Sequence, residues 1–202
     1  MTRKSRPRPY VLALLALLAL LVAPAAASAD AEQSYFFEET AEANWSVPYT
    51  CPDGSTVDAR LLVRSTRDFE SPDTEDADPT ARVQFQAICS GSSFSWVGTG
   101  PVSITSTPNH KSVTVTGTIT VRDIFGVRHT VSVDVAWTGR GALETSVNPT
   151  QGFRVGTSIR QQRAATATGT VTYDGQVLVS GEANHRITPF IRTDEDRYTT
   201  TG

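Results

Sequence analysis

Alternation of apolar and hydroxyl side chains is the feature that most constrains the fold of this chain. Between residues 112 and 122, apolar residues or glycine occupy the odd positions, and threonine occupies every even position from 114 to 120. Residues 128–138 repeat the pattern, with Val131, Val133, Val135 and Trp137 on one side. Side chains of an extended strand point alternately to its two faces, so both segments are predicted to be half-buried strands.

These two segments are predicted to form a hairpin of defined register. A slip by one residue would place valines opposite threonines, so odd positions must pair with odd positions. Asp123 opposite Val127 then leaves a three-residue loop in which Gly126 takes the position that requires a positive φ. The register pairs Val113 with Trp137, Ile119 with Val131 and Arg122 with Arg128.

A second hairpin is indicated by Asp174-Gly175, the residue pair that a type I′ turn prefers. It joins residues 165–173 to residues 176–183. The pattern T-x-T-G-T-x-T occurs at 114–120 and again at 166–172, which indicates either an internal duplication or a chance product of threonine-rich strands. The glycine inside each copy predicts a bulge, or a gap filled by a large neighbour such as Trp96 or Trp137.

Shorter β segments raise the expected total to about ten strands, which favours an all-β, mostly antiparallel β-sandwich. They are predicted at 43–51, 57–64, 81–89, 94–97, 102–106 and 154–162. The outline resembles immunoglobulin-like domains in architecture only, because no tryptophan lies between the two cysteines.

Cys51 and Cys89, the only two cysteines, are expected to form one disulfide. In a simple meander the strands that carry them would flank a third strand at nearly 10 Å from each other. Disulfide-bonded Cα atoms lie closer than about 7 Å. The sequence therefore predicts that these strands are direct neighbours or meet at a sheet corner, and that they do not form a simple meander.

The first 29 residues have the order of a secretory signal peptide. Basic residues at 3, 4, 6 and 8 precede an apolar run over 11–23, and Ala27-Ser28-Ala29 is a small-residue cleavage site before Asp30. The apolar run is too short for an ordinary membrane-spanning helix. We therefore expect a secreted, extracellular protein without membrane insertion after cleavage between Ala29 and Asp30.

The remaining chain is expected to form a single domain over 30–191, followed by a frayed polar tail over 192–202. The best place for a break between sub-lobes is 98–101, and 68–80 is expected to be a mobile acidic loop. Beyond residue 29 there are 14 basic and 21 acidic residues, without a basic cluster. Nucleic acid is therefore an unexpected partner, since its phosphates are bound by clustered Lys and Arg.

The acidic residues between Asp68 and Asp78 are dense enough to suggest calcium, but they lack the spacing of an EF-hand loop. A solvated loop is favoured, and no metal or cofactor is expected. The three histidines, His110, His129 and His185, come without a G-x-S-x-G motif or zinc-ligand spacing, so structural or surface roles are expected for them.

A pair of acidic side chains for glycoside hydrolysis could come from Glu38, Glu39, Glu42, Asp58 or Asp134, but sequence does not give their separation. Trp45 and Trp96 could line a sugar-binding surface, although core positions are favoured. Asn44-Trp45-Ser46 fits a glycosylation sequon. The threonine faces suggest binding to ice or polysaccharide, but threonine also simply favours strands.

The sequence assigns no catalytic or binding residue. It favours a secreted, non-enzymatic binding or interaction module whose partner is an unidentified extracellular protein or glycan. The alternatives are a small secreted hydrolase, with a site assembled only in three dimensions, and a structural component of the cell envelope.

Overall fold

The computed structural model describes residues 32–71, 78–150 and 155–200. The predicted signal peptide, its predicted cleavage site at Ala29 and Asp30, and the middle of the predicted acidic loop lie outside these ranges. Residues 33–200 form one compact unit. The strands are β1 (Glu32–Thr50), β2 (Thr56–Ser71), β3 (Thr80–Cys89), β4 (Ser92–Pro101), β5 (Ser103–Ser106), β6 (Ser112–Asp123), β7 (Arg128–Gly139), β8 (Glu144–Thr150), β9 (Val155–Tyr173), β10 (Gln176–Glu182) and β11 (Phe190–Thr200).

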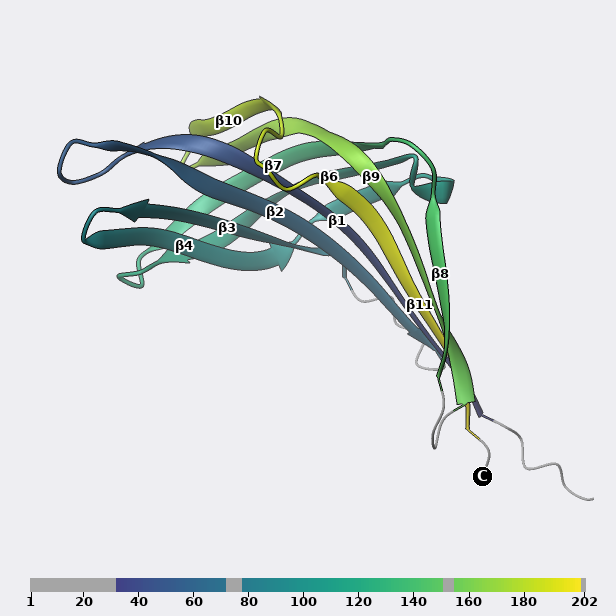
Figure 1. Ribbon diagram of the computed structural model, residues 1–202. Coiled ribbons are helices and arrows are strands. Elements are labelled where there is room, and N and C mark those ends of the chain that lie inside the picture. The colour runs from purple at the N-terminus through teal and green to yellow at the C-terminus, as the bar shows by residue number, and fades with distance from the viewer. Residues whose placement is uncertain (1–31, 72–77, 151–154, 201–202) are drawn as a thin grey trace, which may run out of the picture. The chain divides into compact units, whose positions relative to one another are not determined.

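The described chain is nearly all antiparallel β-sheet, as predicted. Its one helical element is the short 3₁₀ turn η1 (Pro108–His110), so this part of the chain has no helix that could cross a membrane. Hydrogen-bonded neighbours follow the order β10-β9-β11-β1-β2-β3-β4-β6-β5, and β7 pairs with both β6 and β9 (Figure 1). The sheet therefore closes on itself, which gives a sandwich-like arrangement with one interior.

Both predicted hairpins are confirmed. The β6–β7 register pairs Val113 with Trp137, Ile119 with Val131 and Arg122 with Arg128. Asp123 N–H donates to the Val127 carbonyl (3.1 Å), and Gly126 has φ of 80°, as the three-residue loop requires. In the β9–β10 turn, Asp174 and Gly175 both have positive φ.

The disulfide between Cys51 and Cys89 is present, with Cα atoms 5.8 Å apart. The prediction that excluded a simple meander is nevertheless wrong, because β1, β2, β3 and β4 pair consecutively. Pairing between β2 and β3 runs only as far as Arg60 with Gln86, so the last residues of β3 extend beyond it. Cys51 lies in the turn after β1, so it contacts Cys89 beyond the part of β2 that pairs with β3.

Several strands are longer than the sequence predicted. Residues 154–162 and 165–173 belong almost entirely to one strand, β9, which pairs with β8 and β11 in its first half and with β7 and β10 in its second. Residues 192–200 of the expected frayed tail instead belong to β11, and their pairing with β9 runs as far as Thr199 with Val155. Residues 68–71 belong to β2 rather than to a loop, and 98–101 lie within β4.

The interior contains the alternating apolar residues and all three tryptophans, Trp45, Trp96 and Trp137. The favoured core positions for Trp45 and Trp96 are therefore confirmed. The bulge or tryptophan-filled gap expected at the strand glycines is not found. Pairing with β7 is continuous through Gly117 and Gly169, and no tryptophan is among the nearest neighbours of either residue. A Cβ at Gly117 would overlap Val102, and one at Gly169 would overlap the backbone of β7 at Asp134.

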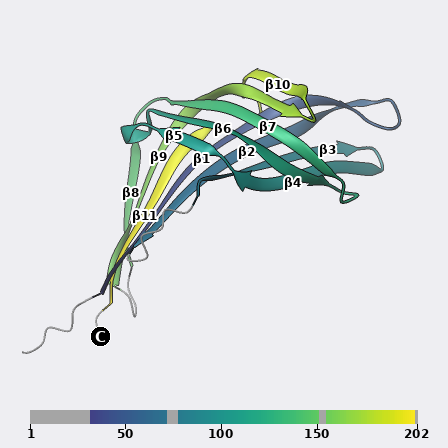
Figure 2. The ribbon, with the colours of Figure 1, turned by 180° about the vertical axis from the view of Figure 1, so that it is seen from behind.

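Five strands lie side by side beyond the apolar interior, in the order β8-β9-β11-β1-β2 (Figures 1 and 2). Along β1, β2 and β11, the odd-numbered residues that are buried in the core are followed by odd-numbered residues on the same inner face of the sheet. In β1 the buried Trp45, Ala43 and Ala41 lead to Glu39 and then to Phe37. This continuation positions the candidate site.

Candidate functional site

A cavity of about 540 Å³ opens where the apolar interior meets the inner face of β1, β2, β9 and β11. Small-molecule sites commonly have volumes of about 300–1,000 Å³. The lining residues come from β1 and β2, from β9 and β11, and from the segment 106–110 that includes η1. The site is thus built from five parts of the chain that are distant in sequence.

Aromatic rings form one wall of the cavity. Tyr35 and Phe37 come from β1 and Phe69 comes from β2, where Phe37 and Phe69 are cross-strand partners. The rings of Tyr35 and Phe69 meet edge to face, with centroids 5.9 Å apart. Burial and the neighbouring Glu195 raise the pKa of Tyr35. These rings offer an apolar surface with Tyr35 in its neutral, hydroxyl-bearing form.

Two opposite charges face the cavity from adjacent strands. Glu39 of β1 is only 7% exposed, and its direct cross-strand partner is Arg67 of β2. Within the described part of the chain, neither side chain forms a hydrogen bond or an ion pair within 4.0 Å. The Glu39 carboxylate lines the cavity and receives no hydrogen bond from the described residues, so it is an acceptor available to a ligand.

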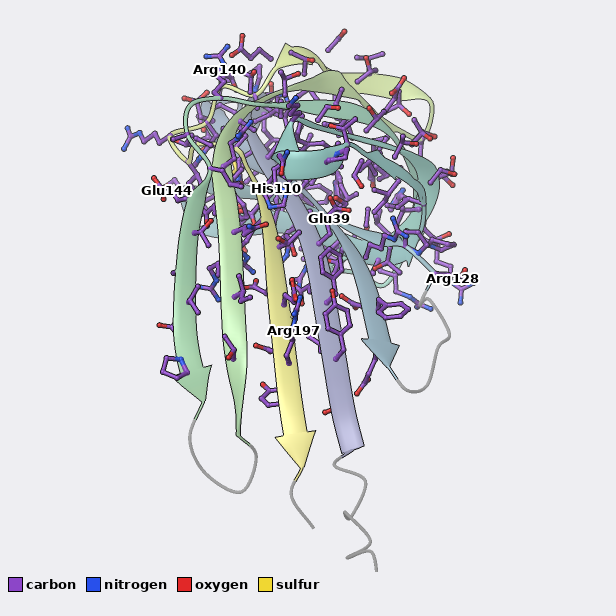
Figure 3. The ribbon with its side chains drawn as sticks, turned by 90° about the vertical axis from the view of Figure 1, so that its right-hand side faces the viewer. Glu39, His110, Arg128, Arg140, Glu144 and Arg197 are labelled. Atoms are coloured by element: carbon purple, nitrogen blue, oxygen red, sulfur yellow. A yellow bond between two sulfur atoms is a disulfide. The ribbon has the colours of Figure 1, made fainter. Side chains whose placement is uncertain are left out.

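His110 closes the cavity from η1, next to Glu39 (Figure 3), and is 6% exposed. Its Nε2 lies 3.1 Å from Thr193 Oγ1 of β11, and the ring also donates a hydrogen bond to the Gln161 backbone carbonyl. A neutral imidazole that donates through one nitrogen must accept through the other. The Thr193 hydroxyl therefore donates to His110.

Burial lowers the pKa of His110, and the nearby Glu39 carboxylate partly opposes this effect. Desolvation disfavours the charged imidazolium, so the neutral form dominates at physiological pH. His110 thus presents a fully hydrogen-bonded, uncharged ring to the cavity.

The backbone that carries His110 is constrained. Asn109 and His110 have φ of 60° and 54°, in the left-handed region that residues other than glycine seldom adopt. Gly139, at the end of β7, donates its N–H to the Lys111 carbonyl (2.8 Å). A Cβ at Gly139 would overlap the His110 carbonyl, so this glycine allows η1 to pack against β7.

His129 lies elsewhere, between two turns at the start of β7. Its Nδ1 is 2.8 Å from Asp174 Oδ2, its Nε2 is 3.5 Å from Asp123 Oδ2, and its ring stacks on Tyr173. Hydrogen bonding to Asp174 raises the pKa of His129 despite desolvation. The described residues place no serine hydroxyl on its ring, so the contacts fit a cross-link between turns.

His185 borders a second cavity, of about 450 Å³, with Ser46 and Asp58. Asn184 Oδ1 accepts a hydrogen bond from Ser46 N–H (2.8 Å), which ties this connection to β1. The lining residues are all polar and include no Phe, Tyr or Trp, so this second cavity is the weaker candidate.

The five candidate carboxylates for glycoside hydrolysis do not converge. Glu39 lines the first cavity and Asp58 the second. Glu38 lies on the opposite face of β1, where it is 3.7 Å from Arg64 and 3.8 Å from Arg192. Glu42 accepts a hydrogen bond from Asn44, and Asp134 is exposed. The described residues therefore place no two of these carboxylates in one cavity.

Asn44 of the glycosylation sequon is fully buried, and its Oδ1 accepts a hydrogen bond from Arg60 (2.7 Å). It is thus inaccessible in the folded chain. In residues 32–71, 78–150 and 155–200, no three His, Cys, Asp or Glu side chains gather as a metal site. The calcium alternative concerns residues 68–78, whose middle lies outside the described ranges, so neither calcium nor the favoured solvated loop is tested there.

The threonines of β6 and β9 share one exposed outer face with β7 between them. Cross-strand neighbours include Thr116 with Asp134 and Asp134 with Thr170. A solvated face of a sheet is commonly built in this way.

Sequence reasoning missed most of the first cavity. Of its lining residues, only Glu39 and His110 had been singled out. The missed signal is the period of two itself, which continues from the apolar core through Ser65, Arg67 and Phe69 in β2. Where the inward-facing residues of a strand change from aliphatic to aromatic and charged, the strand has extended past the core and its inner face can line a cavity.

No protein-family model and no curated protein matches this chain. One similar solved structure is described as "Enduracididine biosynthesis enzyme MppR complexed with the condensation product of pyruvate and imidazole 4-carboxaldehyde". The sequence identity is 9%, the TM-score is 0.30, and the alignment covers 86% of this chain and 90% of that chain. A TM-score this low carries no argument about function.

Proposed function

We propose that this chain is an exported, non-enzymatic binding module whose ligand occupies the cavity of about 540 Å³. The observation that carries the proposal is the composition of that cavity: three aromatic rings beside a buried carboxylate that no described residue neutralises. Apolar walls with a few convergent polar groups are typical of small-molecule sites. Export is supported by the order of residues 1–29 and by the disulfide, which persists in oxidising compartments.

Export is tested by expressing the full chain and measuring the mass of the protein in the medium. The expected product begins at Asp30. Retention of the full-length chain inside the cell would contradict export without bearing on the cavity.

Binding is tested by thermal melting against a library of amino acids, short peptides and oligosaccharides. A ligand at one hundred times its Kd stabilises the folded state by about 2.7 kcal/mol, which raises Tm by roughly 5–10 °C in a domain of this size. Phe69→Ala removes part of the aromatic wall and should abolish the rise. Phe125→Ala is the matched control, because Phe125 is 78% exposed in the β6–β7 loop, and it should keep the rise. A library without any hit, or hits insensitive to Phe69→Ala, would overturn the proposal.

A second candidate function is hydrolysis, favoured by the hydrogen bond from Thr193 to His110 within the cavity. A hydroxyl that donates to a neutral imidazole, itself oriented by another hydrogen bond, is the arrangement of an activated nucleophile. In this alternative, Thr193 Oγ1 attacks an acyl carbonyl, His110 takes its proton and passes it to the leaving alcohol, and water then releases the acyl group. Release of 4-nitrophenolate from 4-nitrophenyl acetate, lost in Thr193→Val, would support it. Equal rates for wild type and Thr193→Val would exclude it.

A further inference from the structure

The position of the two unpaired charges indicates a ligand class, provided that the cavity binds a ligand as proposed above. Glu39 and Arg67 stand directly opposite each other on adjacent antiparallel strands. Their Cβ atoms are therefore about 4.5–5.5 Å apart, and both side chains line the cavity. No ion pair within 4.0 Å joins them, although such a pair would neutralise both charges.

A ligand with a single charge would be attracted by one of these two side chains and repelled by the other. A plain ammonium ion would gain Glu39 as an acceptor but would meet the guanidinium of Arg67. A plain carboxylate would gain Arg67 but would meet the buried Glu39. A ligand that carries both charges close together pairs with both side chains and leaves the net charge of this partly desolvated site at zero.

The remaining walls define the rest of this ligand. The rings of Tyr35, Phe37 and Phe69 offer a surface for an apolar or aromatic group. Among the residues that line the cavity, His110 is neutral, so the two charges come from Glu39 and Arg67. We propose that the cavity binds a free α-amino acid with an aromatic or large apolar side chain, with its ammonium on Glu39, its carboxylate on Arg67 and its side chain on the aromatic wall.

Calorimetric titration of the folded protein with three related compounds tests the proposal. L-Phenylalanine carries both charges, 2-phenylethylamine lacks the carboxylate, and 3-phenylpropanoate lacks the ammonium. A hydrogen bond to a charged group contributes enough to change affinity by roughly tenfold to a hundredfold. The wild type should therefore bind phenylalanine at least about tenfold more tightly than either of the other two compounds.

Two charge-removing variants should change this preference in opposite directions. Glu39→Gln should lose affinity for phenylalanine and gain affinity for 3-phenylpropanoate, because the repelling carboxylate is gone. Arg67→Gln should lose affinity for phenylalanine and gain affinity for 2-phenylethylamine. Glu144→Gln and Arg128→Gln remove exposed charges outside the cavity and should leave all three affinities unchanged (Figure 3). Circular dichroism and Tm of each variant check that it is folded.

Equal binding of the three compounds, or variants that leave their order unchanged, would overturn the amino-acid proposal. The same holds if other library compounds bind in a way that Phe69→Ala abolishes while phenylalanine and its larger relatives do not bind. In that last case the binding function would stand with a different ligand. If no compound binds at all, both proposals fail.

Discussion

At the scale of single residues, His129 is the clearest electrostatic contact outside the cavity. Two aspartates from different turns approach its ring, Asp174 at 2.8 Å and Asp123 at 3.5 Å. Hydrogen bonding to Asp174 raises the pKa of His129 above its ordinary value of about 6.5, and contact with His129 helps to lower the pKa of both carboxyls. The protonated imidazole therefore joins the two turns.

This arrangement predicts a pH-dependent contribution to stability. A raised pKa means that the folded state binds the proton more tightly than the unfolded state. The stabilisation by His129 is thus fully present below about pH 6.5 and is lost as pH rises through the higher pKa of the folded state. Urea unfolding of wild type and His129→Gln between pH 5 and pH 9 should show a difference in unfolding free energy that is largest at the acidic end. A difference that grows with pH would contradict this assignment.

Residue identity alone predicted a structural or surface role for His110 but could not show its hydrogen-bond partners. The imidazole meets Thr193 more than eighty positions later in the chain, and Gln161 lies on a third strand. Such contacts depend on which strands pair, and the identity of a single residue does not determine strand pairing. The unpaired state of Glu39 was equally invisible, because any of five acidic residues fitted the same description.

At the scale of elements, Gly139 governs the placement of η1 (Pro108–His110). Its missing side chain leaves room for the His110 carbonyl and for Arg163 Cδ. Gly139→Ala should destabilise the protein by roughly 1–3 kcal/mol, the usual cost of overpacking, because backbone atoms must move. It should also weaken any ligand of the cavity. Thr138→Ala, at the exposed neighbouring position, is the control for denaturant unfolding and ligand titration; similar effects from both variants would show that the close approach is unimportant.

Hairpins were the elements that sequence specified best, because turn chemistry and alternation act locally. The β6–β7 register followed from Gly126 and from the parity of the valines. In contrast, β11 was not predicted, because its inner face is polar beyond the buried Ile191, with Thr193 beside the cavity. Its outer face is charged, with Arg192 and Asp194 joined at 2.8 Å. Without an apolar face, a strand that lines a cavity resembles a tail.

At the scale of the whole molecule, the Cys51–Cys89 disulfide links the turn after β1 to the end of β3 across 38 positions. In the chain-entropy model, closing a loop of this length stabilises the folded state by about 4 kcal/mol. The double variant Cys51→Ala/Cys89→Ala should lose about that amount in guanidinium unfolding at unchanged pH. Wild type treated with a reductant should lose a similar amount. A loss below about 1 kcal/mol would mean that native packing alone fixes this corner.

The cysteine pairing was predictable because the chain offers only two sulfurs, whereas the topology around it was not. A meander separates two cysteines beyond disulfide distance only if both lie within its paired strands. Cys51 instead lies in a turn, where its N–H donates to the Ser55 carbonyl (2.7 Å). A residue in a turn can extend past the end of the adjacent strand, so the spacing between strands does not limit its distance to Cys89.

The closed order of the sheet makes β1 and β11 neighbours although they stand at opposite ends of the described chain. During synthesis, β1 emerges well over a hundred residues before its partner. One edge of the nascent sheet therefore waits with open hydrogen-bonding groups until translation of β11 is complete. Folding that depends on such sequence-distant contacts is slow. We therefore expect holdase chaperones to bind the nascent chain until the sheet closes.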